Sequence, residues 1–214
     1  MAAPQPDLAR RLMVPALSLL LLVLGIAAGM LTASSRVPKD DSAEAGFARD
    51  MATHHAQAVD MSFAVLDNAG DEGVRTIAAD IIVTQSTQRG VFMGWLQQWG
   101  LPQASARPRM AWMPGHSQAM PASGGALMHG MATDAEIQQL RDAHGVAAET
   151  LFLQLMIRHH EGGIIMARAL MSLTKRAEVT QMVKSIDEGQ RAEIAQMKAM
   201  LNARGAQPLP SILE

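Results

Sequence analysis

The sequence lacks cysteine and tyrosine, and aromatic side chains make up only 3% of its 214 residues. Without cysteine the chain has no disulfides, zinc-thiolate sites, iron–sulfur clusters or cysteine nucleophiles. Scarce aromatics leave few platforms on which nucleic acid bases could stack. A formal net charge of −2 argues against a broad phosphate-binding surface. We therefore expect no nucleic acid partner.

Methionine is the residue type that is unusually frequent. The chain has 17 Met and seven His, while charged residues account for 18% and apolar residues for 49%. Such a composition is typical of a packed protein rather than a disordered one. The positions of Met and His are therefore the main guide to function.

The N-terminal segment is uncharged from Leu12 to Ser35. Its apolar part is long enough to cross a hydrocarbon layer of ~30 Å as a helix. Arg10 and Arg11 precede it, so the positive-inside rule places tail 1–11 in the cytoplasm. The sequence predicts a single-pass anchor over 12–35 in the cell membrane, with the body on the periplasmic or extracellular side. The alternative is a signal peptide whose cleavage releases the same body as a secreted protein.

The rest of the chain repeats itself without a gap at an offset of 105 residues. The matched positions include Phe47 with Phe152, Met51 with Met156, His54-His55 with His159-His160, Met61 with Met166, Gln85 with Gln190, and Leu96 with Leu201. Repeats of this kind indicate a duplicated unit that buries its apolar face against its copy.

Each repeat has the apolar spacing of two helices. The expected helices are 44–66 and 74–99 in the first copy, and 146–173 and 177–203 in the second. Two such hairpins predict an all-α fold, a four-helix bundle over 44–204. Residues 36–43 would link it to the transmembrane helix, and 205–214 would form a C-terminal tail.

Residues 103–132 between the copies are rich in Pro, Gly, Ser and Ala and show no helical period. This linker contains Met110, Met113, His116, Met120, Met128, His129 and Met131. These side chains cannot all belong to a core if the segment is irregular, and loose Met/His tracts can wrap a soft metal ion. The alternative is a spacer that covers the bundle. Thr133-Asp134-Ala135-Glu136 is a capping box, which predicts a short helix to about Ala143 and a break at Gly145.

The first helix of each copy carries the array Met-x-x-His-His-x5-Met. At about 100° per residue, the first His and both Met fall on one side of the helix, with the second His at its edge. The candidate ligands are Met51, His54, His55, Met61, Met156, His159, His160 and Met166. Thioether and imidazole together suit Cu(I), and silver by similarity, whereas zinc prefers His, carboxylate and Cys.

A structural role for these residues is the alternative. Met commonly fills helical cores, a single buried His is usually a hydrogen-bonded structural group, and the second copy inherits the residues of the first. Matched His pairs flanked by Met at equal offsets favour metal binding. The linker residues form a second candidate metal-binding region.

Enzyme signatures are absent from the sequence. It contains no Glu-x-x-His motif of the di-iron carboxylate bundles, no Gly-x-Ser-x-Gly elbow, and no Walker or dinucleotide fingerprint. We therefore predict a metal-binding protein without catalytic residues. Two alternatives stay open, a non-metal interaction module of the cell envelope that docks a partner protein or a second copy, and a redox enzyme using bound copper.

Two segments resemble the signature helices of the domain-of-unknown-function 305 family. They are FARDMATHHAQAVDMS at 47–62 and FLQLMIRHHEGGIIMA at 152–167, and the resemblance extends over about 44–203. It implies a ferritin-like bundle of exported or anchored bacterial proteins, some of which are linked to copper and silver. Family arrays often have Pro before the His pair, where this chain has Thr53 and Arg158. We expect this difference to alter the helix locally without removing the ligands.

Overall fold

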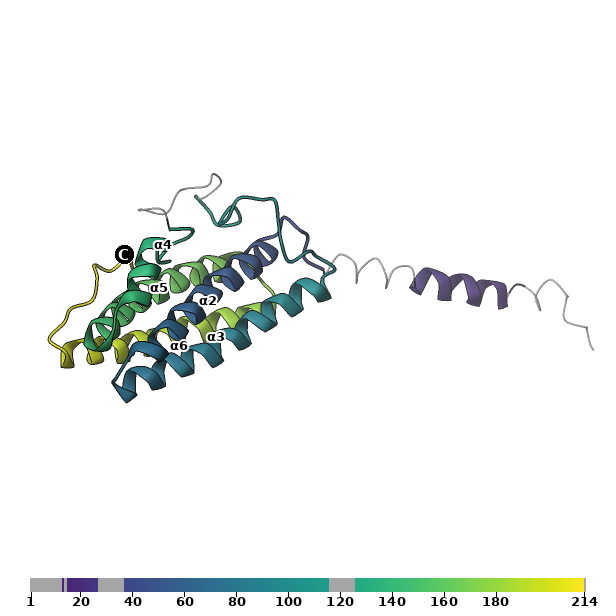
Figure 1. The fold of residues 1–214 in the computed structure, drawn as a ribbon. Helices are drawn as coiled ribbons and strands as arrows, with labels where there is room; N and C mark the ends of the chain where they lie inside the picture. The colour runs from purple at the N-terminus through teal and green to yellow at the C-terminus, as the bar shows by residue number, and fades with distance from the viewer. Residues whose placement is uncertain (1–12, 14, 27–36, 116–125, 214) are drawn as a thin grey trace, which may run out of the picture. The chain divides into compact units, whose positions relative to one another are not determined.

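The structure is a computed structural model that describes residues 13, 15–26, 37–115 and 126–213. The described residues form helices and loops and contain no strand, which confirms the all-α prediction. The chain divides into two units, 1–38 and 39–214. The helices of the second unit are α2 (Ala43–Asn68), α3 (Glu72–Gln98), the short α4 (Asp134–Asp142), α5 (Gly145–Leu173) and α6 (Ala177–Ala203) (Figure 1).

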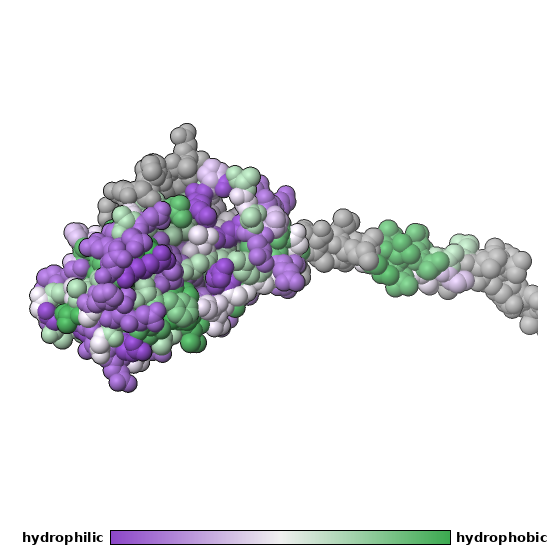
Figure 2. Space-filling view, viewed as in Figure 1, coloured by the Kyte–Doolittle hydropathy of each residue, from purple (hydrophilic) through white to green (hydrophobic). Residues whose placement is uncertain are grey.

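In the first unit, residues 15–26 are helical and exposed. Figure 2 shows that this stretch is mostly hydrophobic, whereas hydrophilic residues cover much of the visible face of the second unit. Within the described ranges, no helix is both long and apolar enough to cross a membrane. Residues 12, 14 and 27–35 of the predicted anchor lie outside the described residues, so the anchor stays a prediction.

The second unit consists of two helical hairpins that pack against each other. α2 packs on α3 and α5 packs on α6, while α2 and α5 join the hairpins and the short α4 lies against both of them. The paired hairpins confirm the duplication inferred from the repeat, and the long helices begin and end within two residues of the expected positions. The predicted capping box of α4 is present, because Thr133 and Glu136 each accept the other's backbone N–H.

Buried polar contacts at the turns fix how the hairpins meet. Asp71 caps α3 by accepting the Val74 N–H at 2.9 Å. The Glu149 carboxylate of α5 accepts the backbone N–H groups of Gly70 and Asp71 and the guanidinium of Arg204. One buried carboxylate therefore ties the turn of the first hairpin to both helices of the second.

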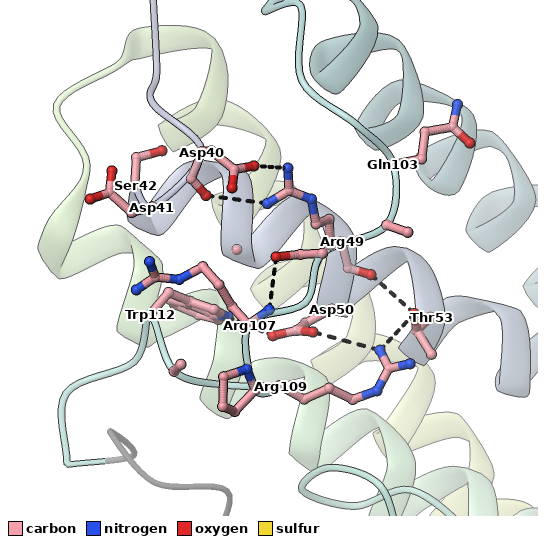
Figure 3. A pocket seen from close by; sticks show the side chains of 15 residues that line it. Asp40, Asp41, Ser42, Arg49, Asp50, Thr53, Gln103, Arg107, Arg109 and Trp112 are labelled. Carbon is pink, nitrogen blue, oxygen red and sulfur yellow. Dashed lines mark hydrogen bonds and ion pairs between the residues drawn. The ribbon is translucent and has the colours of Figure 1, made fainter.

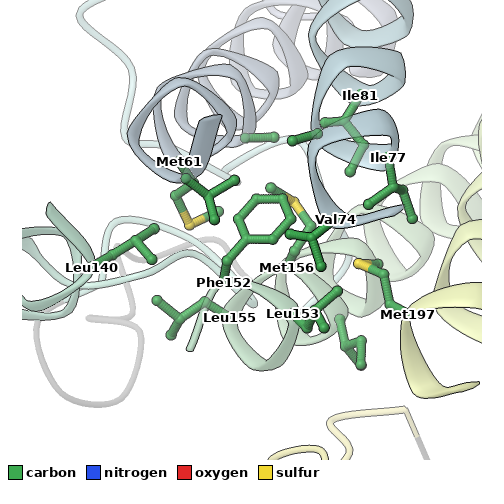
Figure 4. Close-up of a cluster of buried hydrophobic side chains, with 14 of the residues drawn as sticks. Met61, Val74, Ile77, Ile81, Leu140, Phe152, Leu153, Leu155, Met156 and Met197 are labelled. Carbon is green, nitrogen blue, oxygen red and sulfur yellow. The ribbon is translucent and has the colours of Figure 1, made fainter. Parts of the chain in front are cut away.

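The apolar core has two separate clusters. The first joins the C-terminal half of α2 and the N-terminal half of α5 and contains Met61, Phe152 and Met156 (Figure 4). The second joins the opposite halves of these helices and contains Met51 and Met166. The helix positions between the clusters carry buried polar side chains, which we call the His layer: His54, His55, Gln85, His159, His160 and Gln190.

The linker contributes to this core even though it is irregular. Met110, Met128 and Met131 are buried in the second cluster, and Met113 packs against it. Met110 adopts a φ of +64°, which is uncommon outside glycine. His116 and Met120 lie outside the described residues. Three linker methionines therefore have a packing role, which an aperiodic sequence could not reveal.

Candidate metal centre

The centre of the second unit contains four histidines that are completely buried. His54 and His55 come from α2, and His159 and His160 from α5, each with 0% exposure. The rings of His54 and His159 stack across the interface between the hairpins, with centroids 3.8 Å apart and planes inclined by 34°. Each is followed along its helix by the second histidine, at a centroid distance of 6.4 Å in both copies. The structure thus brings both predicted His pairs together.

The outer histidines contact the second helix of their own hairpin. His55 Nε2 lies 2.7 Å from Gln88 Oε1 on α3, and His160 Nε2 lies 2.7 Å from Glu193 Oε2 on α6. Both partners are oxygen acceptors, so we assign the proton to Nε2 in each ring. This tautomer leaves Nδ1 with a free lone pair, the form in which imidazole binds a metal.

His54 makes its contact with the linker. Its Nε2 lies 3.2 Å from the carbonyl oxygen of His129, which again assigns the proton to Nε2 and the lone pair to Nδ1. The predicted linker residue His129 thus reaches the His layer through its backbone.

The layer contains many polar atoms that have no partner. Within the part of the chain that the structure describes, no hydrogen bond is made by Nδ1 of His54, His55, His159 and His160, or by Nε2 of His159. Buried polar groups are normally hydrogen-bonded, and leaving one unpaired costs about 1–3 kcal/mol. The layer therefore presents several lone pairs that a cation could satisfy.

Gln85 and Gln190 add an amide from each hairpin to the layer. Both are buried, and neither end of either amide has a hydrogen-bond partner among the described residues. Gln190 lies directly against Gly163, where a Cβ atom would come within 2.4 Å of its Oε1. The glycine therefore makes room for the amide beside the histidines.

Burial keeps His54, His55 and His159 neutral. Desolvation lowers the pKa of His54 and of His55 from the usual 6.5 to about 3, and it lowers the pKa of His159 well below that usual value. Neighbouring imidazoles act in the same direction, since two stacked rings cannot both carry a proton cheaply. At neutral pH these rings therefore keep their lone pairs.

The polar groups of the layer are imidazoles and amides, and thioethers lie in the clusters on either side. Among the described side chains, no three of His, Asp or Glu are gathered closely enough to hold a metal ion. Met51 and Met166 are buried in the cluster on one side of the layer, and Met61 and Met156 in the cluster on the other. Imidazole and thioether donors therefore occupy neighbouring parts of the core, and together they are the donor types that suit Cu(I).

The second half of the linker docks on the layer through two glycines. Gly130, with a φ of +74°, packs on Gly162 of α5, where a Cβ atom would come within 2.1 Å of the His129 carbonyl oxygen. Gln57 of α2 also holds the backbone of Ala132, through hydrogen bonds of 2.8 and 2.9 Å. This docking places the His129 carbonyl against His54.

The first half of the linker is held by Asp50. Its carboxylate accepts the Met110 backbone N–H at 2.8 Å and the Trp112 indole N–H at 2.9 Å, next to a pocket of about 330 Å³ (Figure 3). Burial raises the pKa of Asp50, although these hydrogen bonds oppose the shift. Arg109 lies 3.7 Å from the same carboxylate. Asp50 therefore positions the linker rather than offering itself to a metal.

Several of these residues were not singled out by sequence reasoning. Gln88 and Glu193 were missed, although the 105-residue offset aligns them just as it aligns Gln85 with Gln190. Glu161, next to the second His pair, binds the C-terminal segment through Ser211 Oγ and the Ile212 N–H, each at 2.9 Å. Applying the offset to the polar positions of α3 and α6 would have revealed the outer partners.

Comparison with known proteins identifies the family. Residues 44–201 match the domain of unknown function DUF305, and the chain belongs to that family. A candidate secreted DUF305 protein from Streptomyces coelicolor is 42% identical, with a TM-score of 0.72 over 80% of this chain and 99% of that one. A DUF305 fragment from Deinococcus radiodurans is 32% identical, with a TM-score of 0.62 over 75% and 96% of the two chains.

The protein CopM is a further structural relative. Its Cu(II)-bound form is 29% identical to this chain, with a TM-score of 0.57 over 76% of this chain and 97% of CopM. CopM has also been solved with Cu(I) and with silver. A search of curated proteins found no match.

The buried histidines predict that the metal-free protein loses stability in acid. The folded-state pKa of His54, His55 and His159 lies below 6.5, so the unfolded chain binds more protons as pH falls from about 6.5 toward 3. The free energy of unfolding should therefore decrease over this range, as urea denaturation of the chelator-treated protein at several pH values would measure. His54→Gln/His159→Gln should flatten the decrease between pH 6.5 and 5, and His144→Gln, at an exposed position, should leave it unchanged. A wild-type stability that is flat over this range would contradict buried neutral rings.

The contact of Gly162 with the His129 carbonyl predicts that a Gly→Ala substitution has opposite effects on stability at Gly162 and at Gly94. Gly162→Ala should lower the free energy of unfolding by about 1–3 kcal/mol, because the new methyl group would overlap the His129 carbonyl. Gly94→Ala on α3 is the matched control, since nothing lies within 4 Å of a Cβ there. The control should stabilise the helix by about 0.5–1 kcal/mol. Equal stability of the two variants in urea denaturation would rule out the docking of the linker on α5.

Proposed function

We propose that this protein is an exported DUF305 protein, a ferritin-like four-helix bundle that binds copper as Cu(I), with silver as an analogue, for sequestration or handover. The observation that carries the proposal is the set of buried imidazole nitrogens without partners at the junction of the hairpins. Their lone pairs lie between clusters that contain buried thioethers, and burial lowers the pKa of His54, His55 and His159. This chemistry fits a soft monovalent ion and disfavours a hard one.

The residues that would hold the ion are the two helical arrays. His54, His55, His159 and His160 would bind through Nδ1, and Met51, Met61, Met156 and Met166 would supply sulfur from either side of the layer. CopM, which is 29% identical to this chain with a TM-score of 0.57, is a protein solved with Cu(I), Cu(II) and silver, and this supports the same class of cargo here. No proton transfer or catalytic step is needed for such a role.

The linker would act as a second, shallower region of metal capture. The residues proposed for this role are Met110, Met113, His116, Met120, Met128, His129 and Met131. His129 and its neighbours touch both α2 and α5 through the backbone. Ions taken up by the linker would thus be delivered close to His54.

The proposed location is the cell envelope. Arg10 and Arg11 before an uncharged stretch support membrane insertion with the helical body outside. The candidate secreted protein from Streptomyces coelicolor supports export of the body. We propose a single-pass anchor, with release after signal cleavage as the alternative outcome, and N-terminal sequencing of the protein from its native envelope would separate the two.

Soft-metal binding should stabilise the folded protein and depend on the layer. Free metal at 100 times the dissociation constant adds about 2.7 kcal/mol to the free energy of unfolding. Cu(I) under reducing conditions should therefore raise the melting temperature of the wild type. His54→Gln/His159→Gln should remove most of this increase while staying folded, because the amides keep polar bulk in the layer. If Cu(I) raised the melting temperature of this variant as much as that of the wild type, the metal would bind outside the His layer.

A second variant tests the linker separately. Changing Met110, Met113, Met120, Met128 and Met131 together to Leu removes the thioethers but keeps similar apolar volume. Such swaps usually cost less than about 1.5 kcal/mol each. The number of ions bound should fall, while the metal-induced rise in melting temperature persists. Unchanged capacity with reduced metal-free stability would assign these methionines to packing alone.

A further inference from the structure

The two outer contacts of the His layer are equivalent in position but differ in charge. The repeat aligns His55 with His160 and Gln88 with Glu193 at the same offset of 105 residues. Both Nε2 to oxygen distances are 2.7 Å, and both partners are half-buried. In one hairpin the imidazole N–H meets a neutral amide, and in the other it meets a carboxylate.

The surroundings of the two contacts share two features, although the Phe92 ring lies 5.6 Å from His55 where the repeat places Met197 in the other hairpin. Gln85 and Gln190 occupy equivalent buried positions one turn away on the same helices. Nδ1 of His55 and Nδ1 of His160 are both buried without a hydrogen-bond partner among the described residues. The chain therefore holds two half-sites that share the distance from the imidazole to its acceptor and differ in the charge of that acceptor.

The group that accepts the Nε2–H bond changes how strongly Nδ1 of the same imidazole binds a metal. A carboxylate accepts the Nε2–H bond more strongly than an amide does and raises the basicity of the opposite nitrogen. Its negative charge also offsets an added cation more effectively in a poorly solvated interior than in water. Glu193 is only 22% exposed and His160 is fully buried, so solvent screens this charge incompletely.

We propose that Glu193 makes the His160 half of the layer the stronger soft-metal site and that Gln88 leaves the His55 half weaker, so that ions load in order. Glu193 acts as a positioning residue, because it works through His160 and does not itself hold the ion. This inference rests on the proposed soft-metal function and adds an internal order to it. Because Gln88 and Glu193 differ in charge, the His55 and His160 halves should differ in metal affinity.

The test uses the natural difference between the copies as its own control. The variants are Glu193→Gln, Gln88→Glu and the double exchange Gln88→Glu/Glu193→Gln, each of which installs a side chain that the fold already accepts at the equivalent position. Silver ions are titrated into the full chain, while long-range proton–nitrogen NMR follows the ring nitrogens of His55 and His160. Competition with a chromophoric chelator measures Cu(I) affinity in parallel.

In the wild type, Nδ1 of His160 should shift at lower silver than Nδ1 of His55. Glu193→Gln should weaken the first Cu(I) binding event by about 10- to 100-fold, as loss of such an outer partner typically does. The double exchange should restore the affinity and reverse the order, so that His55 responds first. A merely structural role for Glu193 would not move the response from one ring to the other.

Three outcomes overturn the inference while the proposed function survives. These are simultaneous shifts of both rings in the wild type, unchanged Cu(I) affinity in Glu193→Gln, or an unchanged order after the double exchange. If neither ring of the wild type responds to silver, both the inference and the proposed function are wrong.

Discussion

Contact between the stacked rings of His54 and His159 is the constraint on which the rest of the structure depends. For two imidazoles that are fully buried at a centroid distance of 3.8 Å, burial and mutual repulsion both lower the pKa and favour the neutral forms. Around them the helices place further polar groups, which divide the core into two apolar clusters. A body of this size would be more stable with a continuous apolar core, so the unpaired nitrogens point to a requirement other than folding.

The linker belongs to this arrangement as much as the long helices do. Asp50 and Gln57 of α2 hold its two halves, and Gly162 of α5 allows its backbone to approach within contact distance. Buried linker methionines complete the second cluster, and the His129 carbonyl determines which nitrogen of His54 carries the proton. A segment between two copies of a repeat thus closes the core and reaches the candidate site.

Much of this arrangement could be predicted from helical periodicity and duplication. The two hairpins, the cap at Thr133 and the inward direction of His54 and His159 follow from local spacing, which is a strong signal in long helices. His55 and His160, expected at the edge of the apolar stripe, are also fully buried. Burial of Met110 could not be foreseen, because the segment around it has no helical period and Met110 itself adopts a left-handed backbone conformation. The partnership of His160 with Glu193 depends on the packing of α5 on α6, which spacing within a single helix does not specify.

The most direct test of the account is an anomalous-scattering difference map of the silver-loaded protein, collected from crystals grown with silver. The account predicts a strong peak within bonding distance of Nδ1 of a histidine in the layer, with a methionine sulfur completing the coordination. Peaks confined to the surface or to the linker, with the His54 and His159 rings still stacked in the absence of any ion between the hairpins, would contradict it.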